Sequence, residues 1–274
     1  MTSLAAGSLA LSAGMAIAAG LIGSFALMRR MTLAADALSH VALPGIGMAI
    51  ILAVHPLAGA VVALIAGAVL IWALEGRTRL ATETIIGVVF SAALAIGVLL
   101  TTGEELVDAL FGAPSTLSWP EIIAGFLGAG AVILFVLLAR DRLIMMFVSS
   151  DIARTAGINV RRLSLLYLLA FAITIALGLR YLGALLMGSL MIIPPATARR
   201  LARNLTGMLV ISAMVALVAT LLGGWMATRF NRESGPVIVV VAAACFFLSL
   251  AGPRAIAPGS TLREENSHKK PAHL

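Results

Sequence analysis

Long runs of uncharged, mainly apolar residues dominate the pattern along the chain. A helix needs roughly 20 such residues to cross about 30 Å of hydrocarbon. Residues 1–28 carry no charge, and the run from Val41 to Leu74 is long enough for two spans, divided at His55-Pro56. The remaining uncharged runs cover 84–103, 122–139, 163–179, 181–198, 204–228 and 235–253. The pattern therefore predicts eight or nine transmembrane helices.

These runs lack the alternation of apolar and polar residues that a β-barrel needs, so we expect an all-α, polytopic transmembrane helix bundle. Composition agrees, because 61% of the 274 residues are hydrophobic, only 11% are charged and the mean hydropathy is +1.08. A soluble domain carries about a quarter charged residues. We expect residues 1–252 to form one transmembrane domain. Residues 253–274, which include His268 and His273, are predicted to form a disordered cytoplasmic tail.

The formal charge of +7 is explained by the distribution of basic residues about a membrane, without a nucleic-acid partner. Nine spans with an outside N-terminus leave inner segments that hold 16 of the 19 Arg and Lys. The longest outer loop, about 102–121, is acidic instead. An eight-span arrangement would need 181–198 to be re-entrant or fused to its neighbour. The inner segments are 29–35, 75–83, 140–162, 199–203 and 254–274.

Two ionisable residues stand out near the start of the second predicted span. Placing such a residue inside a span costs roughly 2.5–3.5 kcal/mol, so each one is a candidate for a functional role. Asp36 and His40 are four residues apart, which places both side chains on one helix face. A carboxylate oxygen and an imidazole nitrogen suit Mn²⁺, Fe²⁺ or Zn²⁺, and a second copy across a dimer interface would bring the ligands to four. Alternatively, Asp36 interacts with the helix dipole and His40 bonds within the bundle.

A second group of residues combines a double proline with a basic stretch. We expect Pro194 and Pro195 to interrupt the apolar run and a short basic helix to follow on the cytoplasmic face, where it could dock on a soluble partner. The alternative is a plain positive-inside anchor. A similar segment, Ser149–Gly157, has helix-start and helix-stop signals in another inner loop. The docking residues would be Pro194, Pro195, Thr197, Arg199, Arg200 and Arg203.

No Walker-type G-x-x-x-x-G-K-[ST] signature and no H-E-x-x-H zinc motif occurs in the chain. We therefore expect the chain not to be an enzyme, and any ATP to be hydrolysed by another polypeptide. We also expect no permanently bound cofactor.

At these residues the chain resembles the zinc/manganese/iron permeases of cluster-type bacterial ABC importers, the family of ZnuB- and MntB-type membrane subunits. The resemblance covers roughly 9–252 and consists of four patterns that occur in the right order. Pro195 stands where the family has alanine, and Val41 where alanine often follows the histidine. The patterns are Arg29-Arg30 with Asp36-Ala-Leu-Ser-His40-Val-Ala-Leu-Pro44-Gly45, then Asp151-Ile-Ala-Arg154-Thr-Ala-Gly157, then Ile192-Ile-Pro194-Pro195-Ala-Thr197-Ala-Arg199-Arg200-Leu-Ala-Arg203, and finally Glu233-Ser234-Gly235-Pro236-Val-Ile238-Val239.

The resemblance implies a type II ABC importer-like permease of the bacterial inner membrane. It implies a second permease subunit, identical or related, two cytoplasmic ATPase subunits and an extracytoplasmic metal-binding protein. Asp36 and His40 would line the translocation path, and residues 194–204 would be the coupling helix that receives the ATPase stroke.

The sequence therefore predicts uptake of manganese, zinc or iron by alternating access, with the metal as transported substrate. Because a histidine must be neutral to bind a metal, transport should weaken as the pH falls toward about 6. One rival is a permease for a metal chelate such as a siderophore or cobalamin, for which the Asp36/His40 pair is unsuited. Another is an ATP-independent secondary transporter, which would need more coupling groups inside the spans.

Overall fold

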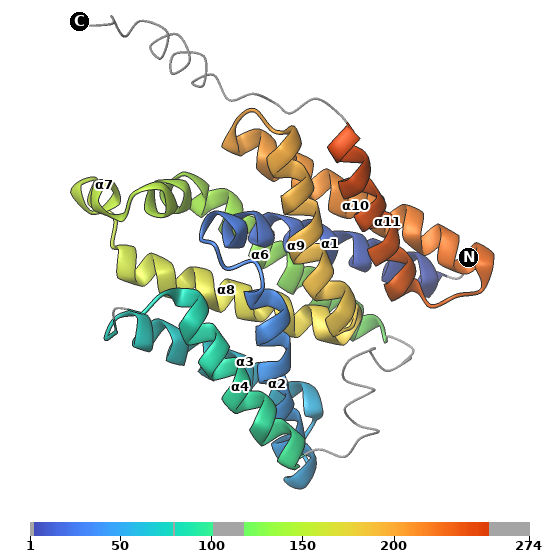
Figure 1. Ribbon diagram of the computed structural model, residues 1–274. Coiled ribbons are helices and arrows are strands. Elements are labelled where there is room, and N and C mark those ends of the chain that lie inside the picture. Colours follow the sequence, from blue (N-terminus) through green and yellow to red (C-terminus); the bar gives the residue numbers. More distant parts are fainter. Residues whose placement is uncertain (1–2, 79, 101–117, 252–274) are drawn as a thin grey trace, which may run out of the picture.

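The computed structural model describes residues 3–78, 80–100 and 118–251, and every regular element among them is a helix (Figure 1). The predicted tail with His268 and His273, and most of the acidic loop at 102–121, lie outside the described residues. The helices are α1 (Ser3–Met28), α2 (Ala34–Ile51), α3 (Pro56–Glu75), α4 (Thr82–Leu100), α6 (Trp119–Val148), α7 (Ser150–Thr155), α8 (Val160–Tyr181), α9 (Ala184–Leu201), α10 (Leu205–Phe230) and α11 (Ser234–Ala251).

Eight of the described helices are long and apolar enough to cross a membrane, which confirms the all-α prediction. Helix α9 is not among them, and Arg199 and Arg200 lie in its last turn. It is nevertheless a separate helix of 18 residues, divided from α8 at Gly183, where φ is 85°. The segment 181–198 is therefore not fused to the preceding helix.

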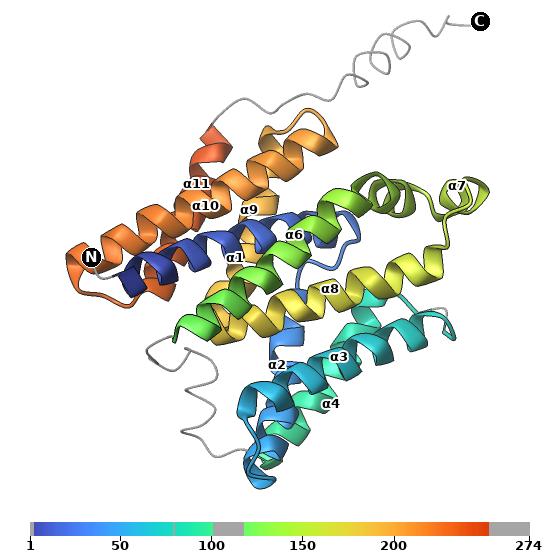
Figure 2. The same ribbon diagram turned by 180° about the vertical axis from the view of Figure 1, so that it is seen from behind.

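The helices pack in two groups (Figures 1 and 2). In one group α1 packs against α6, α9 and α10, and α11 packs against α9 and α10. In the other group α2 packs against both α3 and α4. Helix α8 joins the groups because it contacts α3 on one side and α6 on the other. The contact between α2 and α9 brings the groups together near the start of α2.

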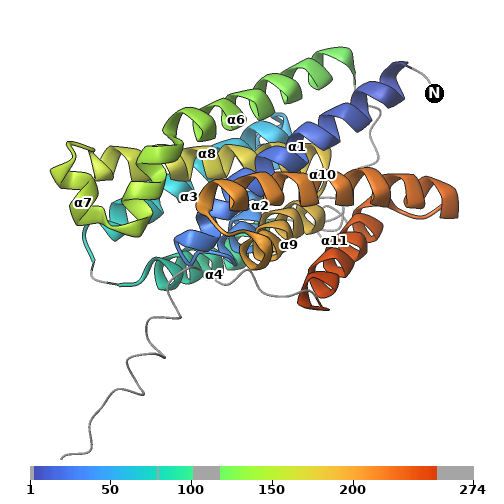
Figure 3. The same cartoon turned by 90° about the horizontal axis from the view of Figure 1, so that it is seen from above.

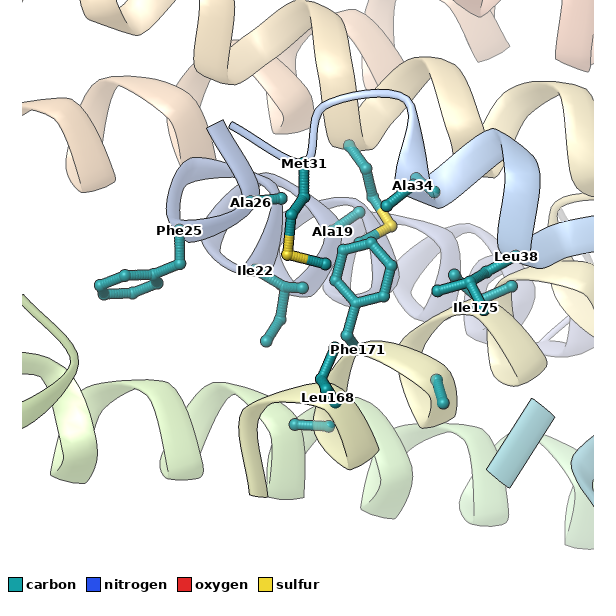
Figure 4. Packing of buried hydrophobic residues seen from close by; sticks show 14 of the residues in the cluster. Ala19, Ile22, Phe25, Ala26, Met31, Ala34, Leu38, Leu168, Phe171 and Ile175 are labelled. Carbon is teal, nitrogen blue, oxygen red and sulfur yellow. The ribbon is translucent and has the colours of Figure 1, made fainter. Parts of the chain in front are cut away.

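The core between the two groups is built around aromatic residues of α8. Tyr167 and Phe171 are fully buried, and the Tyr167 hydroxyl donates a hydrogen bond of 3.2 Å to the carbonyl oxygen of Ile22 in α1. Figure 4 shows Phe171 pointing toward α1 and Met31, with Leu38 of α2 beside Ile175. The start of α2 is thus anchored on a packed apolar layer.

The short helix α7 marks one end of the molecule. Figures 1 and 3 place it opposite the start of α1. Helices α1, α3 and α6 end on the α7 side, while α4 and α8 begin there (Figure 1). The predicted inner segments 29–35, 75–83 and 140–162 adjoin these helix ends, so their arginines gather on the α7 side of the bundle.

Candidate functional site

Asp36 and His40 lie one turn apart on α2, on the same face of the helix. Asp36 is in the first turn, where the helix dipole also favours a carboxylate. Its side chain is exposed, and His40 is half-buried. Ser39, between them, is buried and its hydroxyl donates a hydrogen bond of 2.6 Å to the carbonyl oxygen of Asp36. Only the aspartate and the histidine of this stretch therefore offer free metal-binding atoms.

Two neighbours from distant parts of the chain surround the pair. The ring of Phe90 on α4 packs against the imidazole of His40, with 5.6 Å between ring centroids and an interplanar angle of 58°. On the other side, Gly188 of α9 faces Asp36, because a Cβ atom placed on Gly188 would lie 3.6 Å from Asp36 Oδ1. A glycine here leaves open the space next to the carboxylate. No local sequence pattern identifies either neighbour.

The pair is incomplete as a metal site. Among the residues that the structure describes, no group of three or more His, Cys, Asp or Glu residues gathers in a way that could hold a metal ion. One carboxylate and one imidazole leave most positions of a four- to six-coordinate ion unfilled. Within the described residues the pair therefore lacks further side-chain ligands, which water or another chain could supply.

The face of α2 that carries the pair is exposed toward its two ends. Between them Pro44, one turn after His40, is half-buried and lies against Gly97 of α4. Much of the rest of the helix is buried against α3 and α4. The two exposed ends of the stripe are therefore available to a partner or a passing ion, and their apolar members are Leu33, Met48 and Ile51.

Helix α2 is held from behind by glycine contacts. A Cβ atom on Gly45 would lie 2.1 Å from the carbonyl oxygen of Gly59 on α3, and a Cβ atom on Gly59 would lie 2.1 Å from that of Gly45. Only glycine permits this approach. Gly97 of α4 makes a similar contact, since its Cβ atom would lie 2.8 Å from the Cβ atom of Leu43. The helix continues through Pro44, so Pro44-Gly45 does not break it.

The prediction of a helix break at the double proline is wrong. Pro194 and Pro195 lie inside α9, which runs unbroken to Leu201. Because Pro195 has no N–H, it cannot bond to the carbonyl oxygen of Met191 one turn earlier. That oxygen instead lies against α1 at Gly23, where a Cβ atom would come within 2.2 Å of it. The carbonyl group that loses its helical hydrogen bond to Pro195 therefore lies in the contact between α9 and α1.

The residues expected to form a docking surface on α9 are only partly accessible. Pro194, Pro195 and Thr197 are buried, and the Thr197 hydroxyl donates a hydrogen bond of 2.9 Å to the carbonyl oxygen of Ile193. Arg199 and Arg203 are exposed. The guanidinium group of Arg200 donates to the carbonyl oxygens of Ser249 and Leu250, at 3.2 and 3.4 Å, and so binds the end of α11.

Helix α7 confirms the helix-start and helix-stop signals in Ser149–Gly157. The Ser149 hydroxyl accepts a hydrogen bond from the N–H of Ile152, and Gly157 ends the segment with a φ of 78°. Ala153 is the one buried residue of the helix, and Ile152 is 60% exposed. A groove of about 360 Å³ beside it is lined by Gly157, Arg142 and Arg162, among others. An exposed apolar side chain on a projecting helix is typical of a contact surface.

Arg29, the first residue of the basic pair, is largely covered, with 14% of its side chain exposed, and does not take part in this surface. Its Nη2 atom donates hydrogen bonds of 2.7 and 2.6 Å to the two carboxylate oxygens of Glu75 at the end of α3. Its guanidinium carbon lies 5.7 Å and 6.0 Å from the ring centroids of Phe147 and Tyr167. Since α1 and α3 have little other contact, this ion pair links the two helix groups.

The chain matches the profile described as the ABC 3 transport family over residues 2–252. It is 32% identical to the high-affinity zinc uptake system membrane protein ZnuB of Haemophilus influenzae, over 84% of this chain and 90% of that protein. It is 31% identical to the manganese transport system membrane protein MntC of Listeria monocytogenes, over 85% of both chains. The chelated iron transport system membrane protein YfeD of Yersinia pestis is 30% identical, over 85% of this chain and 80% of that protein.

Solved structures show the same fold. A chain of PsaBC from Streptococcus pneumoniae in complex with Fab aligns with a TM-score of 0.78 and 26% identity, over 97% of this chain and 96% of that one. An inward-facing putative metal-chelate type ABC transporter aligns with a TM-score of 0.69 over 88% of this chain and 84% of that one. Its 17% identity supports the fold alone.

Proposed function

The chain belongs to the ABC 3 transport family and is the membrane permease subunit of an ABC importer for zinc, manganese or iron, in which we propose that the ion passes Asp36 and His40. It is a multi-pass membrane protein that works within an ABC transporter complex, and it is not itself catalytic. The observation that supports the route most directly is the partly exposed start of α2. The carboxylate and the imidazole lie there, one turn apart, next to a glycine.

A second permease subunit would complete the site. The exposed stripe of α2 is apolar on both sides of the pair, so a second copy or a relative could cover it and add its own aspartate and histidine. Four ligands of mixed carboxylate and imidazole type suit the three candidate ions. A site divided between two subunits can also release its ion when they move apart, as alternating access requires.

Helix α7 fits the role of the main contact for the ATPase. It projects on the arginine-rich side, which the positive-inside rule places in the cytoplasm (Figure 1). The arginines at the end of α9, expected from the sequence in this role, line a different pocket from the groove beside α7. An extracytoplasmic metal-binding protein would deliver the ion at the opposite end of the bundle.

Metal accumulation in cells tests the route. Cells that lack their own high-affinity importers would express this chain with its ATPase and binding protein, as wild type, Asp36→Ala or His40→Ala. Glu83→Gln is the matched control, because it removes an exposed carboxylate from the first turn of α4. Expression and complex assembly would be measured in parallel.

The proposal predicts that both α2 variants lose uptake of one ion while the complex assembles normally and the control stays active. Normal uptake in both α2 variants would contradict the proposed route and would leave Asp36 and His40 with structural roles only, in the helix dipole interaction and in packing. The ion that accumulates in the wild type identifies the substrate.

A further inference from the structure

A pocket of about 450 Å³ lies where α1 and α9 end and α10 begins. Three exposed arginines line it, Arg30, Arg199 and Arg203, and no carboxylate does. None of the three forms an ion pair within the part of the chain that the structure describes. The rest of the lining is mostly apolar and includes Leu27, Met28, Phe147, Val148, Leu205 and Met208.

Arg30 holds a backbone conformation that normally belongs to glycine. Its φ is 60°, and the hydrogen bonds around it form a Schellman-type end to α1. The N–H of Met31 donates to the carbonyl oxygen of Ala26 at 2.8 Å, and that of Arg30 donates to the carbonyl oxygen of Leu27 at 3.2 Å. Glycine would fit this position without steric cost. A strained residue that carries an exposed cation into a pocket points to a use for its side chain.

The pocket lies at the border of the membrane. The predicted spans formed by α1 and α10 end at Met28 and begin at Leu205, and both residues line the pocket. Its apolar lining is therefore level with the ends of the lipid chains, and the arginines are level with the headgroups. The side is the arginine-rich one, which faces the cytoplasmic leaflet.

We propose that this pocket binds the headgroup of an anionic phospholipid, with the phosphate held by Arg30, Arg199 and Arg203. Basic pockets between helix ends on the cytoplasmic side are suited to such headgroups. The apolar lining suits the first part of the acyl chains, whereas a soluble anion would gain nothing from it. A phosphate can accept hydrogen bonds from several guanidinium groups at once.

An acidic segment of the ATPase is the competing occupant, and the structure favours the lipid. The groove beside α7 has no lining residue in common with this pocket. A protein partner that docks on α7 therefore has its own surface and does not require the pocket.

The test uses the purified complete transporter, with its ATPase, in nanodiscs of phosphatidylcholine to which phosphatidylglycerol or cardiolipin is added. Retained lipids would be counted by native mass spectrometry, together with the ATPase subunits and the thermal stability of the complex. Arg30→Gly removes one cation and the backbone strain together. Arg199→Gln/Arg203→Gln removes the other two cations. The matched control, Arg229→Gln/Arg232→Gln, removes two exposed arginines at the other end of α10.

Each arginine near an anionic headgroup contributes a factor of roughly five to affinity. Anionic-lipid retention should therefore fall about five-fold in Arg30→Gly and about 30-fold in the double variant. The control should retain lipid as the wild type does, and Arg30→Gly should be at least as stable as the wild type. Unchanged retention of anionic lipid in both pocket variants would overturn the proposal. Loss of the ATPase with lipid still bound would instead make the pocket an ATPase-docking surface.

Discussion

The ion pair between Arg29 and Glu75 should carry much of the link between the two helix groups. Both side chains are about 85% buried, at 14% and 15% exposed. Removing one member of a buried pair leaves the other charge unpaired, which costs about 3–5 kcal/mol. The Nη1 atom of Arg29 is already buried without a hydrogen-bond partner, so losing the Glu75 carboxylate would leave the guanidinium group still less satisfied. Glu75→Gln should therefore destabilise the permease strongly.

For a chain of this size, a loss of about 3–5 kcal/mol corresponds to a fall in melting temperature of roughly 6–20 °C. The assay is thermal unfolding of the purified permease in detergent, followed by the loss of monodisperse protein. Asp141→Asn is the control, because the pair that it breaks with Arg140 is 37% and 81% exposed. Such exposed pairs contribute about 0.2–1 kcal/mol.

A double substitution tests the reasoning about the unpaired charge. Arg29→Met/Glu75→Leu removes both charges and keeps apolar volume, so it should recover most of the stability lost in Glu75→Gln. The argument is refuted if Glu75→Gln is as stable as Asp141→Asn. It is also refuted if the double variant is less stable than the single one.

Two further predictions concern α2 and its pair. Gly45→Ala should disrupt the α2–α3 contact and reduce folded protein on size-exclusion chromatography, whereas Gly87→Ala, which meets nothing within 4 Å, should be neutral or stabilising. Gly188→Leu should reduce metal uptake because the leucine side chain would fill the space beside Asp36. We expect a loss of roughly ten-fold, which is typical of substitutions next to a metal ligand. Gly188→Ala is the control and should be tolerated, since its Cβ atom would make only ordinary van der Waals contacts.

The spans could be predicted from the sequence because each requires a long run of consecutive apolar residues, which is a local feature of the chain. The charge-free runs coincide with the cores of the described helices, and the division of Val41–Leu74 at His55-Pro56 is confirmed between α2 and α3. The sequence left open whether 181–198 forms a ninth span, and this segment corresponds to α9. Among the long helices that the structure describes, α9 is the one that is not a candidate span, and its last turn is basic.

The errors and omissions have a common physical cause, which is contact between segments far apart in the chain. Pro195 did not end α9, and the carbonyl group that loses its helical hydrogen bond to the proline lies against Gly23 of α1. Likewise Arg29 finds its carboxylate 46 residues away. The neighbours of the metal-binding pair, Phe90 and Gly188, also come from other helices and carry no local signal. By contrast, the i, i+4 spacing of the pair itself could be predicted because it depends on one helix alone.

The most direct test of the proposed route is pulsed electron paramagnetic resonance of Mn²⁺ bound to the purified transporter complex. Mn²⁺ is one of the three candidate ions, and its spectrum reports a directly bound nitrogen. The proposed route predicts a histidine nitrogen coupling in the wild type that disappears in His40→Ala. It also predicts weaker Mn²⁺ binding in Asp36→Ala. An unchanged nitrogen coupling in His40→Ala, or its absence from a metal-loaded wild type, would contradict passage of the ion past this pair.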